Sequence, residues 1–380
     1  MDAHTNSFPR IVVVGAGYAG VAATKRLLTL IPDAHVTVVN PRDVFVERVR
    51  LHQLVAGTAE AIHPLRELLH PAAHLKLGTV ERIDAALQRV IMRDGTELPY
   101  DKLIYAAGSQ LRRGVIDGGD IHGASVAEFE DAERLRDRIF ALPSRATVTV
   151  IGGGPTGLET ATEIAEQRRD LDVVLVSRDS VASTLSDNAR AKILKVLADL
   201  GITTIPNSAV TTVDDGKIVL ADGRHLQTDC PILTASFVAS DLARRSGLNT
   251  DADDRLVVDS GLVSDTSPNI VGAGDAMVVA GSPLRMSCQA AIPLGTHAAE
   301  STVALLRGKQ PKPVGPKFVG RALSLGRGAA IVQRTDRNDR VRSWSVGGRA
   351  GVFVKEQIVA STVGFALHPK RKFFYSWSGR

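Results

Sequence analysis

The segment Ile11-Val-Val-Val-Gly-Ala-Gly-Tyr-Ala-Gly20 decides the fold of this chain. Its first four residues are β-branched, which predicts a short strand buried on both faces, as in a parallel sheet. Residues from about 18 to 30 favour a helix, and His35-Val-Thr-Val-Val-Asn40 favours a second strand. Strand, helix and strand at this spacing predict a βαβ unit.

The three glycines of this segment have separate physical roles. Gly15 permits a tight turn, Gly17 lets the backbone approach a diphosphate, and Gly20 lets the helix pack closely on the strand. The helix N-terminus adds a favourable environment for an anion. Because the glycine segment and its helix lie between two predicted strands, we interpret the segment as a dinucleotide-binding loop and not as an ordinary glycine-rich turn.

The same pattern occurs a second time. Thr147-Val-Thr-Val-Ile151 precedes Gly152-Gly-Gly154-Pro-Thr-Gly157, a helical segment runs to about Gln167, and Asp172-Val-Val-Leu-Val176 follows. Two such loops in one chain are far more specific than one. The chain therefore contains a duplicated nucleotide-binding unit.

Neither unit has the usual acid for ribose hydroxyls at the end of its second strand. The first has Asn40, whose amide oxygen can still accept from a hydroxyl, or which is only a turn former before Pro41. The second has Ser177 and Arg178, and a guanidinium can pair with a 2′-phosphate as a planar fork. This favours NADPH, although Asp179 leaves NADH open and Arg178 could be an ordinary surface charge.

Composition indicates a multidomain globular protein. At 380 residues the chain is too long for one ordinary core, and 44% hydrophobic and 23% charged residues are close to soluble averages. The formal net charge of +5 is small, so we expect no nucleic-acid partner. No apolar stretch reaches the roughly 20 residues that span a bilayer. The N-terminus lacks the apolar segment of a secretory signal, so we expect a cytoplasmic protein.

The chain has two cysteines, Cys230 and Cys288, in no CxxC or CxxxxC arrangement. Their spacing indicates neither a disulfide framework nor a zinc site, and we expect no metal. Cys288 is expected to be a buried small hydrophobe rather than a redox centre.

Two further segments extend the pattern. Pro268-Asn-Ile-Val-Gly-Ala-Gly-Asp275 predicts a short strand that ends in glycine and an acid, and Tyr105-Ala-Ala-Gly108 lies between the two glycine loops. In this order, over about residues 10 to 305, the motifs resemble those of FAD-dependent pyridine nucleotide-disulfide oxidoreductases. The chain is most similar to type II NADH:quinone dehydrogenases and apoptosis-inducing-factor-like reductases. The redox-active cysteine pair of the dithiol members is missing, so electrons must leave the flavin directly.

The resemblance implies an α/β fold with two Rossmann-like domains and a small C-terminal α+β region. The FAD-binding domain would comprise residues 1–112 and 255–310, and the NAD(P)-binding domain residues 113–254. The C-terminal region would comprise residues 311–380, entered through the proline-rich linker 309–317. FAD is the expected cofactor and NAD(P)H the expected co-substrate.

Expected cofactor contacts follow from the loops and the resemblance. For FAD they are Gly15, Gly17, Tyr18, Ala19, Gly20, Asn40, Arg48, Val80, Ala107, Gly108, Gly274, Asp275 and Ile292. For the nicotinamide nucleotide they are Gly152, Gly154, Pro155, Thr156, Gly157, Ser177 and Arg178.

Three residues are expected to act in catalysis. The resemblance places Glu159 near the nicotinamide, although an ordinary helix-face carboxylate is the alternative. Arg48 and His52 are expected beside the flavin ring as cations that stabilise its reduced form, unless residues 41–53 form a salt-bridged surface helix. Residues 289–300 would direct helix N-terminal amides at the same ring.

The expected activity is hydride transfer from NAD(P)H to flavin N5, departure of the nucleotide, and electron transfer to a quinone or another small acceptor. One alternative is a reductase of a ferredoxin-like protein, which the basic charge balance would suit. Another is a low-turnover flavin-containing redox sensor, which the departures at Asn40 and Ser177 would allow.

The tail His368–Trp377 interleaves cations with aromatics. This is typical of an interfacial membrane anchor, and equally of a packed C-terminal strand with solvated lysines. Peripheral membrane contact and a homodimer are therefore both left open.

Overall fold

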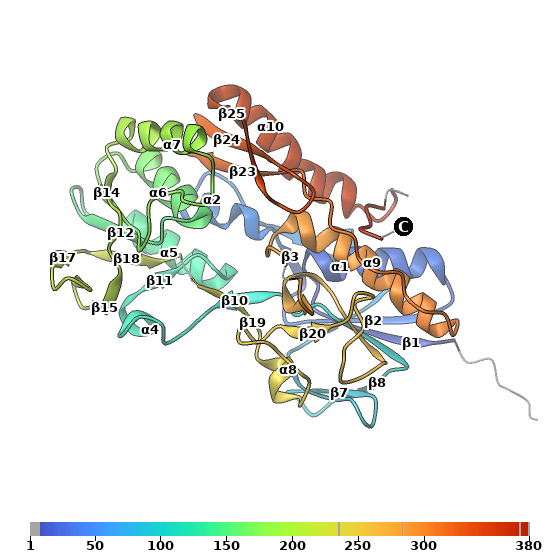
Figure 1. Cartoon of the computed structure of the whole chain (residues 1–380). Coiled ribbons are helices and arrows are strands. Elements are labelled where there is room, and N and C mark those ends of the chain that lie inside the picture. Colours follow the sequence, from blue (N-terminus) through green and yellow to red (C-terminus); the bar gives the residue numbers. More distant parts are fainter. Residues whose placement is uncertain (1–7, 235, 283, 372–373, 379–380) are drawn as a thin grey trace, which may run out of the picture.

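Two parallel sheets of five strands each organise the chain (Figure 1). The computed structural model describes residues 8–234, 236–282, 284–371 and 374–378. Each sheet is built around one of the two glycine-loop units, so the expected α/β fold with two Rossmann-like units is confirmed.

The first sheet has the strand order β21-β9-β1-β2-β5. Its strands are β1 (Arg10–Val14), β2 (His35–Asn40), β5 (His74–Leu77), β9 (Lys102–Tyr105) and β21 (Ile270–Gly272). Val14 pairs with Val39 on one side and Tyr105 on the other, so the carboxyl ends of these strands share one edge. The β-branched run of β1 is fully covered, as a strand between two others in a parallel sheet requires.

Helices α1 (Tyr18–Leu30) and α9 (Cys288–Leu306) pack closely against each other beside this sheet. A Cβ on Gly295 of α9 would lie 2.1 Å from the carbonyl oxygen of Ala19. The crossing therefore requires glycine, and it fixes the start of α9 against the start of α1.

Smaller elements surround the first sheet. They are β3 (Val44–Val46), η1 (Arg48–Arg50), β4 (Ile62–Pro64), α3 (Leu65–Leu68), β6 (Val80–Asp84), β7 (Arg89–Met92), β8 (Glu97–Pro99), α8 (Leu242–Arg245), β20 (Leu256–Val258), η2 (Gly274–Ala276) and β22 (Met277–Val279). Helix α2 (Leu51–Val55) follows η1 but packs against the second unit.

The second sheet has the order β11-β18-β12-β13-β14. Its strands are β11 (Ala124–Ser125), β12 (Thr147–Ile151), β13 (Asp172–Val176), β14 (Thr203–Ile205) and β18 (Cys230–Leu233). The accompanying elements are α4 (Gly119–His122), α5 (Phe129–Ala141), α6 (Pro155–Gln167), α7 (Asp187–Asp199), β15 (Val210–Asp214), β16 (Lys217–Leu220) and β17 (His225–Gln227). An antiparallel pair, β10 (Ser109–Leu111) with β19 (Phe237–Ala239), connects the two lobes (Figure 1).

Each sheet has its own hydrophobic core, and short segments cross between them. Leu51, Leu54 and Val55 of α2 pack into the core of the second sheet, whereas Leu242 of α8 packs into that of the first. The expected domain limits at residues 112, 254 and 310 stay a prediction.

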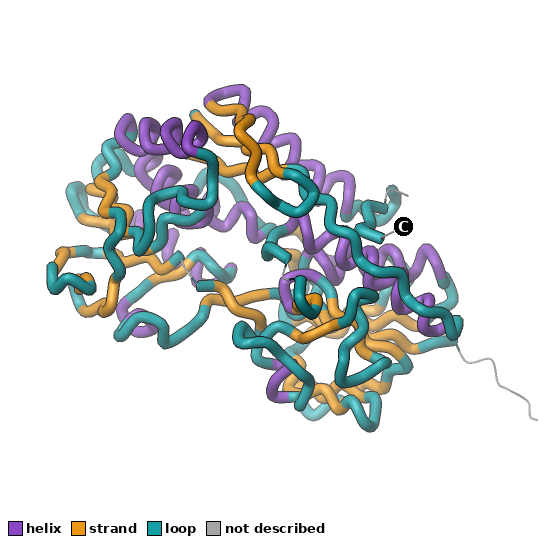
Figure 2. The backbone as a smooth tube through the Cα atoms, in the orientation of Figure 1, coloured by secondary structure: helices purple, strands orange, loops and turns teal. Residues whose placement is uncertain are grey.

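The C-terminal region is an antiparallel sheet covered by a helix, as expected. It comprises β23 (Gly320–Leu325), β24 (Ala329–Thr335), β25 (Val341–Gly347), α10 (Gly348–Ser361) and the π-helix η3 (Thr362–Ala366). A Cβ on Gly351 would lie 2.6 Å from the Ala330 carbonyl oxygen, so α10 and β24 are in close contact. Figure 2 shows this sheet and helix above the second lobe.

The C-terminal tail is packed against the protein where it is described. Trp377 is fully buried, with its ring edge-on to Phe318 at 4.8 Å, and the Tyr375 hydroxyl donates to the Lys317 carbonyl. Lys372 and Phe373 lie outside the described residues. Burial of Trp377 and the Tyr375 contact favour the packed-tail alternative, and membrane contact stays a prediction.

Candidate active site

The first glycine loop is tight at two glycines and open at the third. Gly15 has φ +99°, and a Cβ there would lie 2.3 Å from the Ala106 carbonyl oxygen. A Cβ on Gly20 would lie 1.9 Å from the Gly15 carbonyl oxygen, whereas one on Gly17 would meet no atom within 4 Å. Gly17 is also the N-cap of α1. The open backbone at a helix N-terminus is what a diphosphate requires.

Asn40 supports this loop directly. Its Oδ1 accepts from the Ala16 N–H at 3.1 Å, and its Nδ2 donates to the Arg42 carbonyl at 2.7 Å. One lone pair of Oδ1 is left for a ribose hydroxyl, so that contact stays a prediction. The Gly78 N–H donates to the Asn40 carbonyl at 2.9 Å, which brings Val80 to the same edge of the sheet.

The segments that follow β9 and β21 meet at this edge. Ala107 and Gly108 come directly after β9, which lies between β1 and β21. A Cβ on Gly274 would lie 2.7 Å from the Cβ of Ala19, so the Gly-Asp segment packs on the start of α1. The expected FAD contacts are thus brought together from separate parts of the chain.

Arg48 and Asp275 meet through Ser109, and Ser287 binds Asp275 from the other side; the motifs indicated neither serine. Asp275 accepts from the Ser287 N–H at 3.1 Å and from the Ser109 hydroxyl at 3.3 Å. Arg48 donates to the Ser109 carbonyl at 2.7 Å. Burial raises the pKa of Asp275 although the Arg48 charge opposes it. Arg48, the cation expected beside the flavin, therefore lies in one hydrogen-bond network with Asp275, an expected FAD contact.

The N-terminus of α9 completes this part of the site. Ser287 caps the helix by accepting from the Ala290 N–H, and Ile292 is buried one turn further on. Among the described residues, Gln289 Oε1 is buried without a hydrogen-bond partner, which suits a ligand that donates one. Burial raises the pKa of the Cys288 thiol to about 11, consistent with a small hydrophobe. The tight glycines, the open Gly17 and this oxygen together fit FAD.

The second glycine loop repeats the geometry of the first. A Cβ on Gly157 would lie 1.8 Å from the Gly152 carbonyl oxygen, whereas one on Gly154 would meet nothing within 4 Å. Gly154 is the N-cap of α6, and Pro155 and Thr156 open that helix. Ser177 is buried at the end of β13, and Arg178 next to it is exposed.

His52, Ser324 and Lys355 are buried and form a polar cluster with the partly buried Glu159. Glu159 Oε1 accepts from the Ser324 N–H at 2.9 Å and from its hydroxyl at 3.1 Å. Lys355 Nζ lies 2.9 Å from Ser324 Oγ and 3.3 Å from Glu159 Oε1. His52 Nε2 lies 3.0 Å from the same hydroxyl. Ser324 has one proton to donate and two lone pairs, so this set is saturated when His52 carries its proton on Nε2.

Two pKa shifts describe this cluster. Burial lowers the pKa of His52 to about 4, so His52 is neutral at pH 7 and its expected role as a cation is wrong. Burial raises the pKa of Glu159, but the Lys355 charge and the Ser324 N–H outweigh it and keep the pKa below its ordinary value. The cluster therefore holds a charged Glu159–Lys355 pair beside a neutral imidazole.

The Arg48 network and this cluster are adjacent along the chain. Arg48 and His52 are four residues apart on η1 and α2, about 6 Å at helical rise. Residues 41–53 do not form one surface helix: β3 and η1 precede α2, and all five residues of α2 are buried. Arg50 of η1 is nevertheless salt-bridged, to Glu47 and Glu356.

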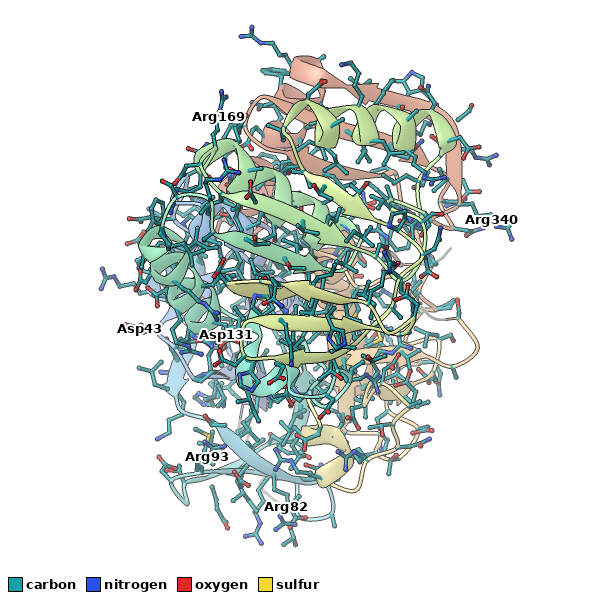
Figure 3. The ribbon with its side chains drawn as sticks, turned by 90° about the vertical axis from the view of Figure 1, so that its left-hand side faces the viewer. Asp43, Arg82, Arg93, Asp131, Arg169 and Arg340 are labelled. Atoms are coloured by element: carbon teal, nitrogen blue, oxygen red, sulfur yellow. The ribbon has the colours of Figure 1, made fainter. Side chains whose placement is uncertain are left out.

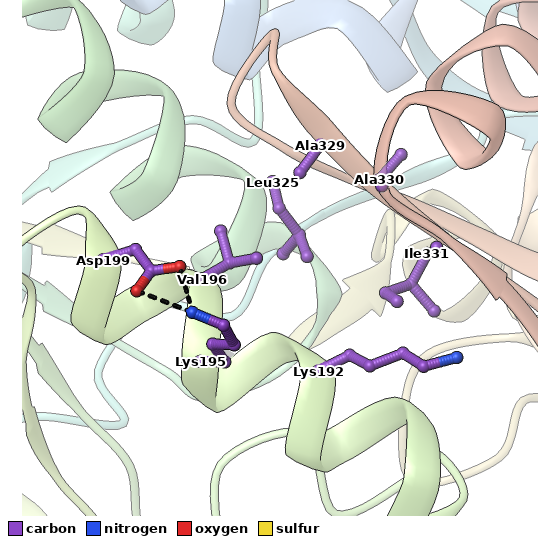
Figure 4. A pocket seen from close by; sticks show the side chains of 10 residues that line it. Lys192, Lys195, Val196, Asp199, Leu325, Ala329, Ala330 and Ile331 are labelled. Atoms are coloured by element: carbon purple, nitrogen blue, oxygen red, sulfur yellow. Dashed lines mark hydrogen bonds and ion pairs between the residues drawn. The ribbon is translucent and has the colours of Figure 1, made fainter.

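A groove of about 350 Å³ lies behind the cluster, between α7 and the C-terminal sheet (Figure 4). Leu325 and Ile331 form its floor, and Lys195 pairs with Asp199 at its rim. Neighbouring residues of a strand point to opposite faces, so Leu325 faces the groove while Ser324 faces Glu159. None of the glycine-loop residues lines this groove.

Known proteins resemble this chain over most of its length. The family model described as pyridine nucleotide-disulphide oxidoreductase matches residues 9–300. An NADH dehydrogenase-like protein of Mycobacterium tuberculosis is 31% identical over 317 residues, 76% of this chain and 78% of that protein. The type II NADH:quinone oxidoreductase Ndh of the same organism is 28% identical, covering 80% of this chain and 74% of the relative.

A solved structure has the same overall fold. It is the sulfide:quinone oxidoreductase of Aquifex aeolicus, which aligns with a TM-score of 0.81 at 18% identity over 95% of this chain and 92% of its own. At that identity the likeness concerns the fold alone.

Proposed function

The chain belongs to the pyridine nucleotide-disulphide oxidoreductase family as an FAD-dependent NAD(P)H oxidoreductase, and from this premise we propose that it passes its electrons to a quinone. The family resemblance predicted from the glycine loops is thereby confirmed. When bound, FAD would accept the hydride equivalent of NAD(P)H and pass the electrons on. Relatives whose names state quinone reduction support the choice of acceptor.

The buried Glu159–Ser324–Lys355 cluster carries the proposal. Reduction of a quinone to a quinol consumes two protons, and groups within the protein can supply them. Glu159 is ionised, so the proton would come from the Lys355 ammonium, pass over the Ser324 hydroxyl to Glu159, and be delivered from there to the reduced acceptor. A disulfide relay needs two cysteines side by side, but Cys230 lies inside the second sheet and Cys288 begins α9.

The remaining residues bind and orient. The first loop, Gly274 and Asp275 would hold FAD. Arg48, which donates to the Ser109 carbonyl, would place a positive charge beside the flavin ring. The second loop would hold the diphosphate of NAD(P)H on the N-terminus of α6, from which Glu159 projects. These assignments, and the domain limits given above, belong to the proposal.

The test is anaerobic rapid mixing with a short-chain quinone. We expect NAD(P)H to bleach the flavin of wild-type protein and the quinone to restore its colour with multiple turnovers. Glu159→Gln should slow the quinone step by about 100-fold, while flavin reduction by NAD(P)H changes by less than about threefold. Glu60→Gln removes an exposed carboxylate and serves as the matched control.

Other outcomes identify the alternatives. Rapid electron transfer to a ferredoxin, with none to the quinone, would show a ferredoxin reductase instead. Slow bleaching by both NADH and NADPH, without turnover on either acceptor, would indicate a flavin-containing redox sensor.

We also propose peripheral membrane contact, through α10 rather than through the tail. Exposed apolar side chains gather there, with Phe353 68% exposed, Val354 37% and Ile358 44%. No helix in the described part of the chain is long and apolar enough to cross a membrane. Phe353→Asp should abolish co-sedimentation with anionic lipid vesicles and leave quinone turnover in detergent unchanged. Retained sedimentation would contradict this contact. Size-exclusion chromatography would test whether the protein is a homodimer.

A further inference from the structure

We propose that the second glycine loop prefers NADPH to NADH and that Arg178 selects the 2′-phosphate. This inference rests on the proposed use of a nicotinamide dinucleotide at that loop. It goes further by naming which of the two nucleotides the site is built for.

Ser177 takes the position at which dinucleotide-binding folds carry a ribose-binding acid. The Gly152 N–H donates to the Val176 carbonyl at 2.8 Å, the same contact that Gly15 makes with Val39 at 2.8 Å. Ser177 is therefore the equivalent of Asn40 at the end of the neighbouring strand.

The Ser177 side chain is fixed in position and carries no negative charge that would repel a 2′-phosphate. Its backbone N–H donates to Ile205, and its carbonyl accepts from the Ser208 N–H at 2.8 Å. A Cβ on Gly153 would lie 2.3 Å from Ser177 Oγ, so the serine packs directly on the glycine loop. An aspartate or glutamate here would repel the dianionic 2′-phosphate, whereas a hydroxyl can donate to it.

Arg178 is free to exchange its partner for a phosphate. Its side chain is 80% exposed, and the Asp179 side chain is 66% exposed. The ion pair between them is long, with 3.5 Å between Arg178 Nε and the Asp179 carboxylate. Exposed pairs of this kind contribute little. A guanidinium binds phosphate oxygens as a planar fork, and the two negative charges of a 2′-phosphate attract it more strongly than the single charge of Asp179 does.

A second arginine approaches the same strand end. Arg224 Nη2 donates to Ser208 Oγ at 3.1 Å, and Ser208 in turn is bonded to Ser177. Its Nε is held by Asp222 at 2.8 Å. The two arginines and their two aspartate partners nearly cancel in charge, so one charge-assisted contact to the 2′-phosphate sets the size of the effect. The preference for NADPH over NADH should therefore be about 10- to 100-fold.

The experiment measures binding, independently of turnover. Purified full-length flavoprotein is titrated with NADP⁺ and with NAD⁺ by isothermal titration calorimetry. We expect wild-type protein to bind NADP⁺ about 10- to 100-fold more tightly, and Arg178→Ala to lose that preference with little change in NAD⁺ affinity. Ser177→Glu should reverse the preference.

Arg169→Ala is the matched control, because it removes the same charge from the same unit. Arg169 lies between α6 and β13, at the opposite end of β13 from Ser177, and projects from the surface (Figure 3). It should leave both affinities unchanged. Equal affinities in wild-type protein, or equal losses for both nucleotides in Arg178→Ala, would overturn the inference and leave the proposed function standing. Binding of neither nucleotide would overturn both.

Discussion

Replacing His52 by glutamine should reduce the loss of unfolding free energy that wild-type protein shows as the pH falls below about 6.5. Burial lowers the pKa of His52 from 6.5 to about 4, with Lys355, Arg327 and Arg50 adding to the effect and Glu159 opposing it. In the unfolded chain a histidine gains its proton as the pH falls through about 6.5, whereas folded protein keeps His52 neutral. The unfolded state therefore binds protons first, and stability is lost as the pH falls from about 6.5 towards 4.

The magnitude follows from the shift. About 2.5 pKa units correspond to about 3 kcal/mol of unfolding free energy once the pH lies below 4, of which about 2 kcal/mol is already lost at pH 5. This is a large part of the 5–15 kcal/mol that is typical of folded domains. Glu159 does not obscure the effect, because its pKa lies below its ordinary value and its own loss occurs at lower pH.

The assay is urea unfolding at about pH 7.5 and pH 5, followed by circular dichroism and by tryptophan fluorescence. Coincident transitions justify a single free energy. Between the two pH values wild-type protein should lose about 2 kcal/mol more than His52→Gln. His225→Gln, which replaces an exposed histidine, should behave like wild type. Equal pH dependence in wild-type and His52→Gln protein would refute the reasoning, whatever their absolute stabilities.

Three further outcomes are expected. Gly17→Ala should leave the melting temperature of flavin-free protein within about 2 °C of wild type and weaken FAD binding at least about tenfold in fluorescence titration. Gly20→Ala should prevent stable folding, because a Cβ on Gly20, unlike one on Gly17, would lie 1.9 Å from a backbone oxygen. Tight FAD binding by Gly17→Ala would contradict this. Lys355→Met should cost about 3 kcal/mol in urea unfolding, since Glu159 is left buried without its cation, and an unchanged midpoint would count against the pair. Trp377→Ala should cost about 3–5 kcal/mol yet leave vesicle binding intact, and loss of vesicle binding alone would restore the tail as an anchor.

Local sequence was enough to predict the two nucleotide-binding units. The ranges expected for the first helix and the strand after it, 18–30 and 35–40, are those observed for α1 and β2. The reason is that a buried parallel strand, a glycine turn and a helix are each specified by neighbouring residues. Gly20 and Gly157 also follow from local constraints, because the nearest atom that excludes a Cβ there is the carbonyl oxygen of Gly15 or Gly152 in the same loop. At Gly15 the excluding atoms belong to Ala106 and Ala107, which only the tertiary structure brings close.

The polar clusters could not be predicted in this way. Ser324 and Lys355 come from a strand and a helix more than 160 residues beyond Glu159, and no motif marks either of them. Ser109 joins Arg48 to Asp275, and Ser287 also binds Asp275, only because the segments after β9 and β21 and the start of α9 meet at one edge.

The sequence by itself therefore determined the two dinucleotide-binding units, the family and the type of cofactor, since these depend on residues close together in the chain. Only the tertiary structure decided that His52 is neutral, that Glu159 is paired with Lys355, and that Trp377 is buried. Each of these depends on burial and on charges contributed by distant segments, and the free energy of an ionised or aromatic side chain is set by those surroundings.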